Sequence, residues 1–196
     1  MQAIENGIIK GVVGLVSCTN ILSGHDYTTI NFLKELLSRD ILVLVAGCAS
    51  SAAQIEGFMN LSAIEKYAGP GLKNICRSLN IPPALNFGSC VDTGRIILLV
   101  TAIANHLKVD PSQLPVAACC PEYYNNDALV DGLFAVAMGI TTFVSPMLPI
   151  AGAPGVIKLL TKDLENSLGA KFILEQNLAQ AIKLLEMHLE NKCRKL

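Results

Sequence analysis

The run Ile41-Leu42-Val43-Leu44-Val45-Ala46 contains only apolar residues. A strand that is covered on both faces by other elements has such a continuous apolar sequence. A second run rich in β-branched residues, Gly11–Ser17, precedes it, and an amphipathic pattern over Tyr27–Ser38 lies between the two. Parallel strands need a crossover connection, which is usually a helix, so this stretch predicts two parallel strands joined by a helix.

The alternation of short apolar runs with longer helical patterns continues along the chain. We expect further strands at 84–87, 116–118, 141–145 and 171–174, with helical material to about 79, interrupted at 69–71, and helices over 92–107, 126–138, 154–166 and from 178 onward. This pattern predicts an α/β fold, a Rossmann-like doubly wound parallel sheet of about six strands with helices on both faces. The length suits one core, so we expect residues 1–196 to form a single domain.

The composition of the chain limits the kinds of molecule that it is expected to bind. Fifteen Lys and Arg against sixteen Asp and Glu give a net charge of -1, so the chain lacks the basic surface that nucleic-acid phosphates require. Hydrophobic residues make up 52% and charged residues only 16% of the chain, where soluble domains average about 25% charged. The mean hydropathy is +0.47. Such a chain predicts a domain whose faces are covered by other protein.

A membrane span is the competing explanation for the apolar composition. The longest segment without a charged residue, 132–157, contains Pro146, Pro149 and Pro154, which a spanning helix of about 20 residues would not tolerate. The sequence also begins without a basic region and apolar run of the secretory type. We therefore expect a cytoplasmic protein without a membrane span. Its seven cysteines then indicate metal ligands or buried thiols rather than disulfides.

Five of the cysteines follow predicted strands. Cys18, Cys48 and Cys90 come after the first three strands, and Cys119 and Cys120 come after the fourth. Ligands of open α/β sheets bind outside the carboxyl ends of the strands, where neighbouring strands are about 4.8 Å apart. The pattern therefore predicts thiols that converge on a metal cluster, although any one of these cysteines taken alone is better explained by packing. The chain contains neither of the glycine-rich motifs that bind nucleotides in this fold class.

Several segments around these cysteines resemble the C-terminal domain of the anaerobic nickel-iron carbon monoxide dehydrogenase catalytic subunit, in the hybrid-cluster-protein/CO dehydrogenase superfamily. The resemblance spans essentially the whole chain, which corresponds to about the last third of that family's polypeptide. It is carried by Gly11-Val12-Val13-Gly14-Leu15-Val16-Ser17-Cys18-Thr19-Asn20, Leu33-Lys34-Glu35-Leu36, Val43-Leu44-Val45-Ala46-Gly47-Cys48-Ala49, Tyr67-Ala68-Gly69-Pro70-Gly71-Leu72-Lys73, Gly88-Ser89-Cys90-Val91-Asp92, Ile103-Ala104-Asn105, Leu114-Pro115-Val116-Ala117-Ala118 and Pro121-Glu122-Tyr123.

The resemblance implies a ligand set and a reaction. Cys18 and Cys48 would bind iron, and Cys90 would bind nickel, in a nickel-iron-sulfur cluster of the 4Fe-4S type that oxidises CO with water to CO2. In the family, nickel holds CO and an iron holds hydroxide, while one His and two more Cys come from an earlier domain. The implied partners are therefore CO, CO2, water, the remaining domains and, as in the family, a second copy in a homodimer. The isolated chain is expected to be inactive.

The sequence also departs from the family's pattern. Asp127 occupies the position of the family's acid-base lysine, and an ionised aspartate accepts hydrogen bonds but cannot donate one. This departure leaves two alternatives to the interpretation that the chain is part of an enzyme. The first is a non-catalytic iron-sulfur or nickel-binding module, and the second is a truncated remnant. Four residues outside the ligand set could still lie beside the cluster: His25, Asp92, Cys119 and Cys120. The alternatives are a solvated loop position for His25, a helix cap for Asp92 and buried packing for the two cysteines. We expect His106 and His188 to be structural, and assign no role to Cys76 or Cys193.

Overall fold

Six strands pair side by side in the part of the chain that the computed structural model describes, residues 2–194. Their order is β3-β2-β1-β4-β5-β6, and every pair is parallel. The chain therefore starts in the middle of the sheet and turns back after β3, which is the doubly wound arrangement. The predicted fold class is confirmed. The strands are β1 (Gly11–Ser17), β2 (Ile41–Gly47), β3 (Ala84–Asn86), β4 (Val116–Cys120), β5 (Thr141–Val144) and β6 (Phe172–Ile173).

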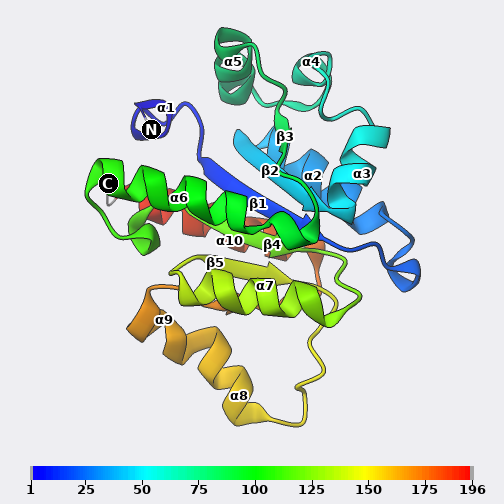
Figure 1. Cartoon of the computed structure of the whole chain (residues 1–196), viewed down its shortest axis with the longest axis vertical. Helices are drawn as coiled ribbons and strands as arrows, with labels where there is room; N and C mark the ends of the chain where they lie inside the picture. The colour runs from blue at the N-terminus through cyan, green and yellow to red at the C-terminus, as the bar shows by residue number, and fades with distance from the viewer. Residues whose placement is uncertain (1, 195–196) are drawn as a thin grey trace.

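Helices cover both faces of this sheet, with α6 and α7 in front of it in Figure 1 and α2 and α10 behind. The helices are α1 (Gln2–Glu5), α2 (Tyr27–Ser38), α3 (Cys48–Ile55), α4 (Ala63–Tyr67), α5 (Pro70–Leu79), α6 (Gly94–Leu107), α7 (Asn126–Ala137), α8 (Pro154–Lys158), α9 (Leu164–Leu168) and α10 (Leu178–Cys193). Single turns are η1 (Ile21–Ser23), η2 (Cys90–Asp92) and η3 (Pro111–Gln113), and η4 (Leu159–Asp163) is a π-helical turn.

The face covered by α2 and α10 holds the larger core. Val13 and Val43 of the central strands pack there against Leu36 of α2 and Leu185 of α10, and all four side chains are fully buried. Phe32 of α2 stacks on a phenylalanine of β5, Phe143, with 5.2 Å between ring centroids. Each fully buried side chain of this size contributes about 1.5–3 kcal/mol of burial free energy, so this face anchors the sheet.

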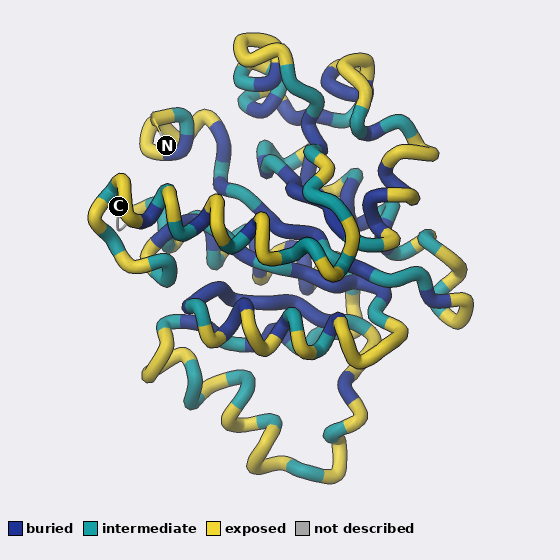
Figure 2. Tube along the Cα trace, in the orientation of Figure 1, coloured by how far each residue is buried: buried dark blue, intermediate teal, exposed yellow. Residues whose placement is uncertain are grey.

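The face covered by α6 and α7 is less completely packed. Ile96, Val100 and Ala104 of α6 are buried against the sheet, but Leu98 on the outer side of the helix is 72% exposed. Figure 2 shows exposed residues along the outer sides of both helices. By length and composition alone, Cys90–Leu107 could cross a membrane, and 17% of that stretch is buried. The stretch that is long and apolar enough is therefore not the charge-free segment 132–157. It contains α6, which packs on the sheet.

The structure corrects three predicted boundaries. Cys119 and Cys120 do not follow β4 but are its last two residues, because the strand stays paired with β5 to its end. The helical material before residue 79 forms three helices, and Pro70 begins α5 rather than merely interrupting a helix. The helix expected over 154–166 is divided by the π-helical turn η4. Short elements that no periodicity signals, α1, η1 and η3, were not predicted.

His188 of α10 makes the stability of the fold dependent on pH. Burial, followed by the nearby Lys192 charge, lowers the pKa of His188 to about 4. The unfolded chain therefore takes up a proton on this side chain below its ordinary pKa of about 6.5, whereas the folded chain does not until about pH 4. Stability is complete above the ordinary pKa and falls by roughly 3 kcal/mol between the two values. Urea unfolding at several pH values should show this loss in the native chain and a flatter profile in His188→Gln; equal profiles would contradict the assignment.

Candidate metal centre

Three of the predicted thiols lie at the carboxyl ends of three neighbouring strands. Cys18 directly follows β1, Cys48 is the first residue of α3 directly after β2, and Cys90 begins η2 after β3. Because the strands are parallel and adjacent in the order β3-β2-β1, these ends belong to one edge of the sheet, at the right of Figure 1. The sequence predicts that these three cysteines lie at the same edge of the sheet, and the structure agrees with this prediction.

Gly47 allows the three loops to approach one another. It has a φ of +71°, a conformation that side chains rarely adopt, and its N–H donates a hydrogen bond to the Gly88 carbonyl at 3.0 Å. A Cβ atom here would lie 3.0 Å from the Ser17 carbonyl oxygen and 3.4 Å from Cys90 Cβ. The glycine thus sits where the loops of Cys18, Cys48 and Cys90 meet, in a space that a side chain would fill.

The three thiols are accessible, and the charges of two of them act on the third. Cys48 is exposed, while Cys18 and Cys90 are half-buried. The pKa of Cys48 is raised, first by partial burial and then by the negative charges of Cys18 and Cys90. In residues 2–194 no three His, Cys, Asp or Glu side chains are arranged around a single metal ion. Thiolate sulfur is a soft donor of the kind that binds iron-sulfur clusters, copper(I) and zinc.

Cys18 has the most activated sulfur of the three. Its pKa is lowered to about 5, chiefly by a hydrogen bond from the Cys120 side chain, and further by the backbone N–H groups of Asn125 and Tyr124. Burial opposes this effect but is outweighed. In the thiol form Sγ lies 3.6 Å from Asn125 Oδ1. The thiolate, which is the form that binds metals and reacts with alkylating agents, is therefore favoured at Cys18.

This difference predicts an order of alkylation in the metal-free chain. At about pH 6 iodoacetamide should modify Cys18 before the more exposed Cys48, because only Cys18 is largely thiolate there. Peptide mass spectrometry over a pH series measures both rates. In Cys120→Ala the rise in Cys18 reactivity should move to higher pH, since its main donor is lost. Faster modification of Cys48 at about pH 6 would contradict the assignment.

Cys119 and Cys120 are buried at the end of β4. Burial raises the pKa of both thiols well above the ordinary value. Cys120 Sγ lies 3.6 Å from the hydroxyl oxygen of Ser17, the residue before Cys18. The packing alternative fits Cys119, whereas Cys120 acts on the edge as a hydrogen-bond donor to Cys18.

The remaining candidates lie in the loops of the same edge. His25 Nδ1 lies 3.4 Å from Asp26 Oδ2, and its side chain is 68% exposed, as the solvated-loop alternative describes. Asp92 accepts hydrogen bonds from the N–H and Oγ of Ser89 at 3.2 and 3.0 Å, which lowers the pKa of Asp92. It closes a capping box around the turn that carries Cys90. Asp127 Oδ2 accepts from Asn125 Nδ2 at 2.9 Å, in the first turn of α7.

Sequence reasoning missed a group of buried polar side chains beneath the edge. Glu122 is 0% exposed, and its Oε2 accepts from the N–H of Thr29 in the first turn of α2 at 3.2 Å. Its own N–H donates to Ser17 Oγ at 3.1 Å, and Asn20 Nδ2 donates to the Tyr123 carbonyl at 3.1 Å. These bonds fix the loop after β4 to the loop after β1. The signal available was a glutamate two residues after a buried strand.

Comparisons with known proteins give one consistent result. A model of the Prismane/CO dehydrogenase family matches residues 1–179. The carbon monoxide dehydrogenase of Archaeoglobus fulgidus is 49% identical over 197 residues, covering 100% of this chain and 32% of the relative. The crystal structure of a nickel-free carbon monoxide dehydrogenase from Thermococcus sp. AM4 superposes with a TM-score of 0.95 at 42% identity, covering 99% of this chain and 30% of that one.

A further solved structure extends the comparison. It is an acetyl-CoA synthase/carbon monoxide dehydrogenase with nickel-zinc and nickel-nickel Fe4S4 clusters in its alpha subunits. The superposition covers 100% of this chain and 30% of that structure's chain, with a TM-score of 0.94 at 32% identity. The chain therefore spans about a third of the length of the relatives that it matches.

Proposed function

Since the chain belongs to the Prismane/CO dehydrogenase family, we propose that it forms the C-terminal, thiolate-bearing third of an anaerobic carbon monoxide dehydrogenase, which oxidises CO with water to CO2. The observation that carries this proposal is the presence of three accessible thiols at one edge of the sheet, from the loops after β1, β2 and β3. The identity to named carbon monoxide dehydrogenases over the whole chain supports the same reaction class.

Each thiol has a proposed role at the metal centre. Cys18 and Cys48 would hold iron, and Cys90 would hold nickel, with the remaining ligands supplied from outside this chain. When bound, a nickel-iron-sulfur cluster supplies the Lewis acidity and the redox capacity that oxidation of CO by water requires. Donors on the loop after β4 favour the thiolate of Cys18, and Gly47 keeps the loops of the three cysteines together. The chain's part is to hold and orient the sulfur ligands.

The exposed apolar surface supports a role within a larger assembly. Apolar side chains that are more than two-thirds exposed lie in the loops of the thiol edge and in the first turn of α2, and apolar side chains between 48% and 72% exposed lie on α6 and α7. A protein working alone rarely exposes such contiguous patches. We propose that the rest of a carbon monoxide dehydrogenase polypeptide covers them, in a cytoplasmic homodimer. The edge residues are Ile21, Leu22, Tyr27, Val91 and Tyr124, and the helix residues are Leu98, Val130, Leu133 and Phe134.

A full-length chimaera tests the proposed function. It joins the upstream part of the Archaeoglobus fulgidus relative to residues 1–196, and CO-dependent dye reduction is measured anaerobically after loading with iron, sulfide and nickel. We expect no activity from the isolated chain and measurable activity from the chimaera. A chimaera that is folded and metal-loaded but inactive would contradict CO oxidation.

Asp127 favours a second candidate, a metal-binding module without turnover. An ionised aspartate in the first turn of α7 cannot donate a proton to a substrate oxygen. The Asp127→Lys chimaera separates the two functions. An increase in rate of about 100-fold, typical of restored acid-base catalysis, would show a working scaffold with a weakened proton donor. No activity with either residue, despite full metal loading, would favour the module.

A further inference from the structure

Two thiols from different loops meet where β1 and β4 end. The strands are parallel neighbours, and the register that pairs Leu15 with Cys119 brings Cys120, the last residue of β4, beside the end of β1. Cys120 Sγ lies 3.6 Å from Ser17 Oγ. The Cys120 side chain also makes hydrogen bonds with the sulfur and with the backbone N–H of Cys18. The Cys18 and Cys120 sulfur atoms are therefore direct neighbours, although the two residues are far apart in the sequence.

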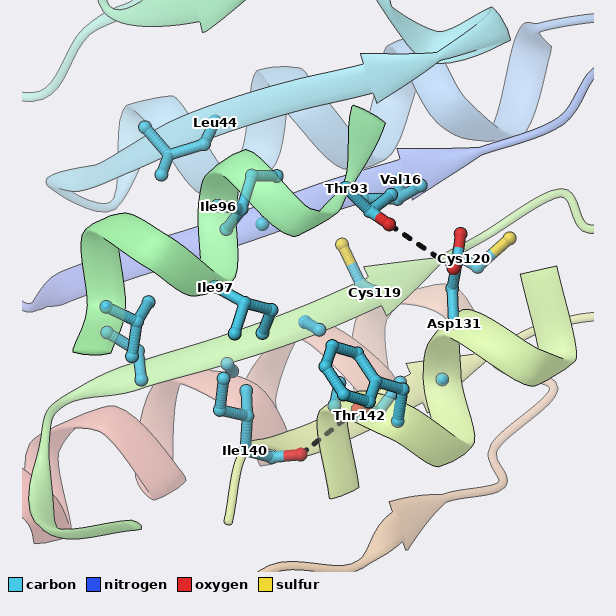
Figure 3. A pocket seen from close by; sticks show the side chains of 18 of the residues that line it. Val16, Leu44, Thr93, Ile96, Ile97, Cys119, Cys120, Asp131, Ile140 and Thr142 are labelled. Atoms are coloured by element: carbon cyan, nitrogen blue, oxygen red, sulfur yellow. Dashed lines mark hydrogen bonds between the residues drawn. The ribbon is translucent and has the colours of Figure 1, made fainter. Parts of the chain in front are cut away.

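The two cysteines of β4 differ in the direction of their side chains. Figure 3 shows the sulfur of Cys120 pointing toward the carboxyl end of the strand and the sulfur of Cys119 pointing back along it. Cys119 belongs to the core that also contains Phe32 and Phe143. Cys120 is thus the β4 thiol that reaches the edge of the sheet.

The two neighbouring thiols also differ in their access to solvent. Cys18 is half-buried, whereas Cys120 is only 3% exposed. A dissolved oxidant therefore reaches Cys18 first. Oxidation of an accessible thiol gives a sulfenic acid, and a second thiol beside it converts this group to a disulfide. Cys120 occupies the position of that second thiol.

Cys48 is the competing partner for Cys18. The register of β1 and β2 places the two cysteines at the same level of the sheet, each directly after its strand. The side chain of Cys48 is exposed, however, and its sulfur accepts a hydrogen bond from the N–H of Thr19. The influence of Cys18 on Cys48 is that of a nearby negative charge, which raises the pKa of Cys48. The direct contact between the side chains of Cys18 and Cys120 favours Cys120 as the partner.

We propose that Cys18 and Cys120 form a reversible disulfide when the metal-free chain meets a hydroperoxide. In the first step the Cys18 thiolate attacks the O–O bond of hydrogen peroxide, which gives a sulfenic acid on Cys18 and releases hydroxide. In the second step the Cys120 sulfur attacks the Cys18 sulfur, so that an S–S bond forms, the S–O bond breaks, and the hydroxyl group leaves as water with the proton of Cys120. The two thiols lose two electrons, and the peroxide gains them.

The disulfide has two consequences for the edge. Cys18 is not available to bind a metal until a thiol reductant restores both thiols, and it is protected from the irreversible oxidation that follows the sulfenic acid. This inference goes beyond the proposed function and does not depend on the oxidation of CO.

The test is disulfide mapping by mass spectrometry of the metal-free chain after treatment with hydrogen peroxide in the absence of other oxidants. We expect a Cys18–Cys120 cross-link that dithiothreitol removes. Cys119→Ala is the matched control, because it removes the neighbouring buried thiol and should leave the cross-link intact. It also assigns the bond, since Cys119 and Cys120 share a peptide.

Dimedone, which traps sulfenic acids, tests the role of Cys120 as the second thiol. In Cys120→Ala the cross-link should be lost, Cys18 should be labelled by dimedone, and further peroxide without dimedone should convert Cys18 to the sulfinic acid. The native chain should show little of either product. Cys120→Ser gives the same comparison if the alanine variant does not fold.

A cross-link between Cys18 and Cys48 in place of Cys18–Cys120 would overturn the proposal. Equal dimedone labelling of Cys18 in the native chain and in Cys120→Ala would overturn it as well. The experiment uses neither metal nor CO. An inactive chimaera would therefore count against the proposed function alone, and a missing Cys18–Cys120 cross-link would count against this thiol pair alone.

Discussion

Gly71→Ala is expected to destabilise the fold by at least about 3 kcal/mol, enough to unfold much of a marginally stable domain. A Cβ atom at this position would lie 1.7 Å from the backbone carbonyl oxygen of Ile8, and neither backbone can yield without moving an element. The start of α5 is also fixed from the other side, because Asp40 Oδ1 accepts a hydrogen bond from the N–H of Leu72 at 2.9 Å. The contact between α5 and the segment before β1 therefore requires glycine.

Gly94→Ala is the matched control for this prediction. Gly94 is the first residue of α6, and a Cβ atom there would meet no atom within 4 Å. Alanine should stabilise this position by about 0.5–1 kcal/mol, because it restricts the unfolded chain and favours helix. Urea unfolding of both variants measures the difference. Equal stability of Gly71→Ala and the native chain would contradict the close contact between Gly71 of α5 and the carbonyl oxygen of Ile8.

Gly47→Ala is expected to lower metal uptake at the edge and to cost about 2 kcal/mol of stability. The φ of +71° strains any side chain, and the new Cβ would press on the Ser17 carbonyl and on Cys90 Cβ. The loops that carry Cys18 and Cys90 must then shift by a few tenths of an ångström. The measurement is iron and acid-labile sulfide per chain after anaerobic reconstitution, together with urea unfolding to confirm that the variant is folded.

Gly152→Ala is the control at an open turn, since a Cβ atom at Gly152 meets nothing within 4 Å. It should bind metal as the native chain does. Normal metal uptake by a folded Gly47→Ala would contradict the role of Gly47 in bringing the thiol loops together.

Local sequence patterns were sufficient to predict most strands of the sheet. The apolar run at Ile41–Ala46 and the run at Gly11–Ser17 agree with β2 and β1 to within a residue, because strands buried on both faces have few polar positions. The strand-helix alternation then determines that the sheet is parallel, and parallel strands place all their carboxyl ends on one edge. Cysteines separated widely in the sequence could therefore be assigned to the same edge without any local metal motif.

The rest depends on contacts between distant segments. Nothing near Glu122 in the sequence indicates that its carboxylate meets the first turn of α2, or that Ser17 accepts from its N–H. The contact between Cys18 and Cys120 depends on how the end of β4 lies beside the end of β1, and the burial of Cys119 on how long β4 stays paired. Periodicity describes one element at a time, so such contacts could not be read from it.

The central claim is that the edge thiols of Cys18, Cys48 and Cys90 are a ligand set. The most direct measurement is the iron, nickel and acid-labile sulfide bound after anaerobic reconstitution by the native chain and by a triple variant with serine at these positions. A second triple variant, with alanine at Cys76, Cys119 and Cys193, removes the same number of thiols outside the set. We expect the native chain and the alanine variant to bind iron, nickel and sulfide, and the serine variant to bind none. Equal metal in all three would contradict the claim.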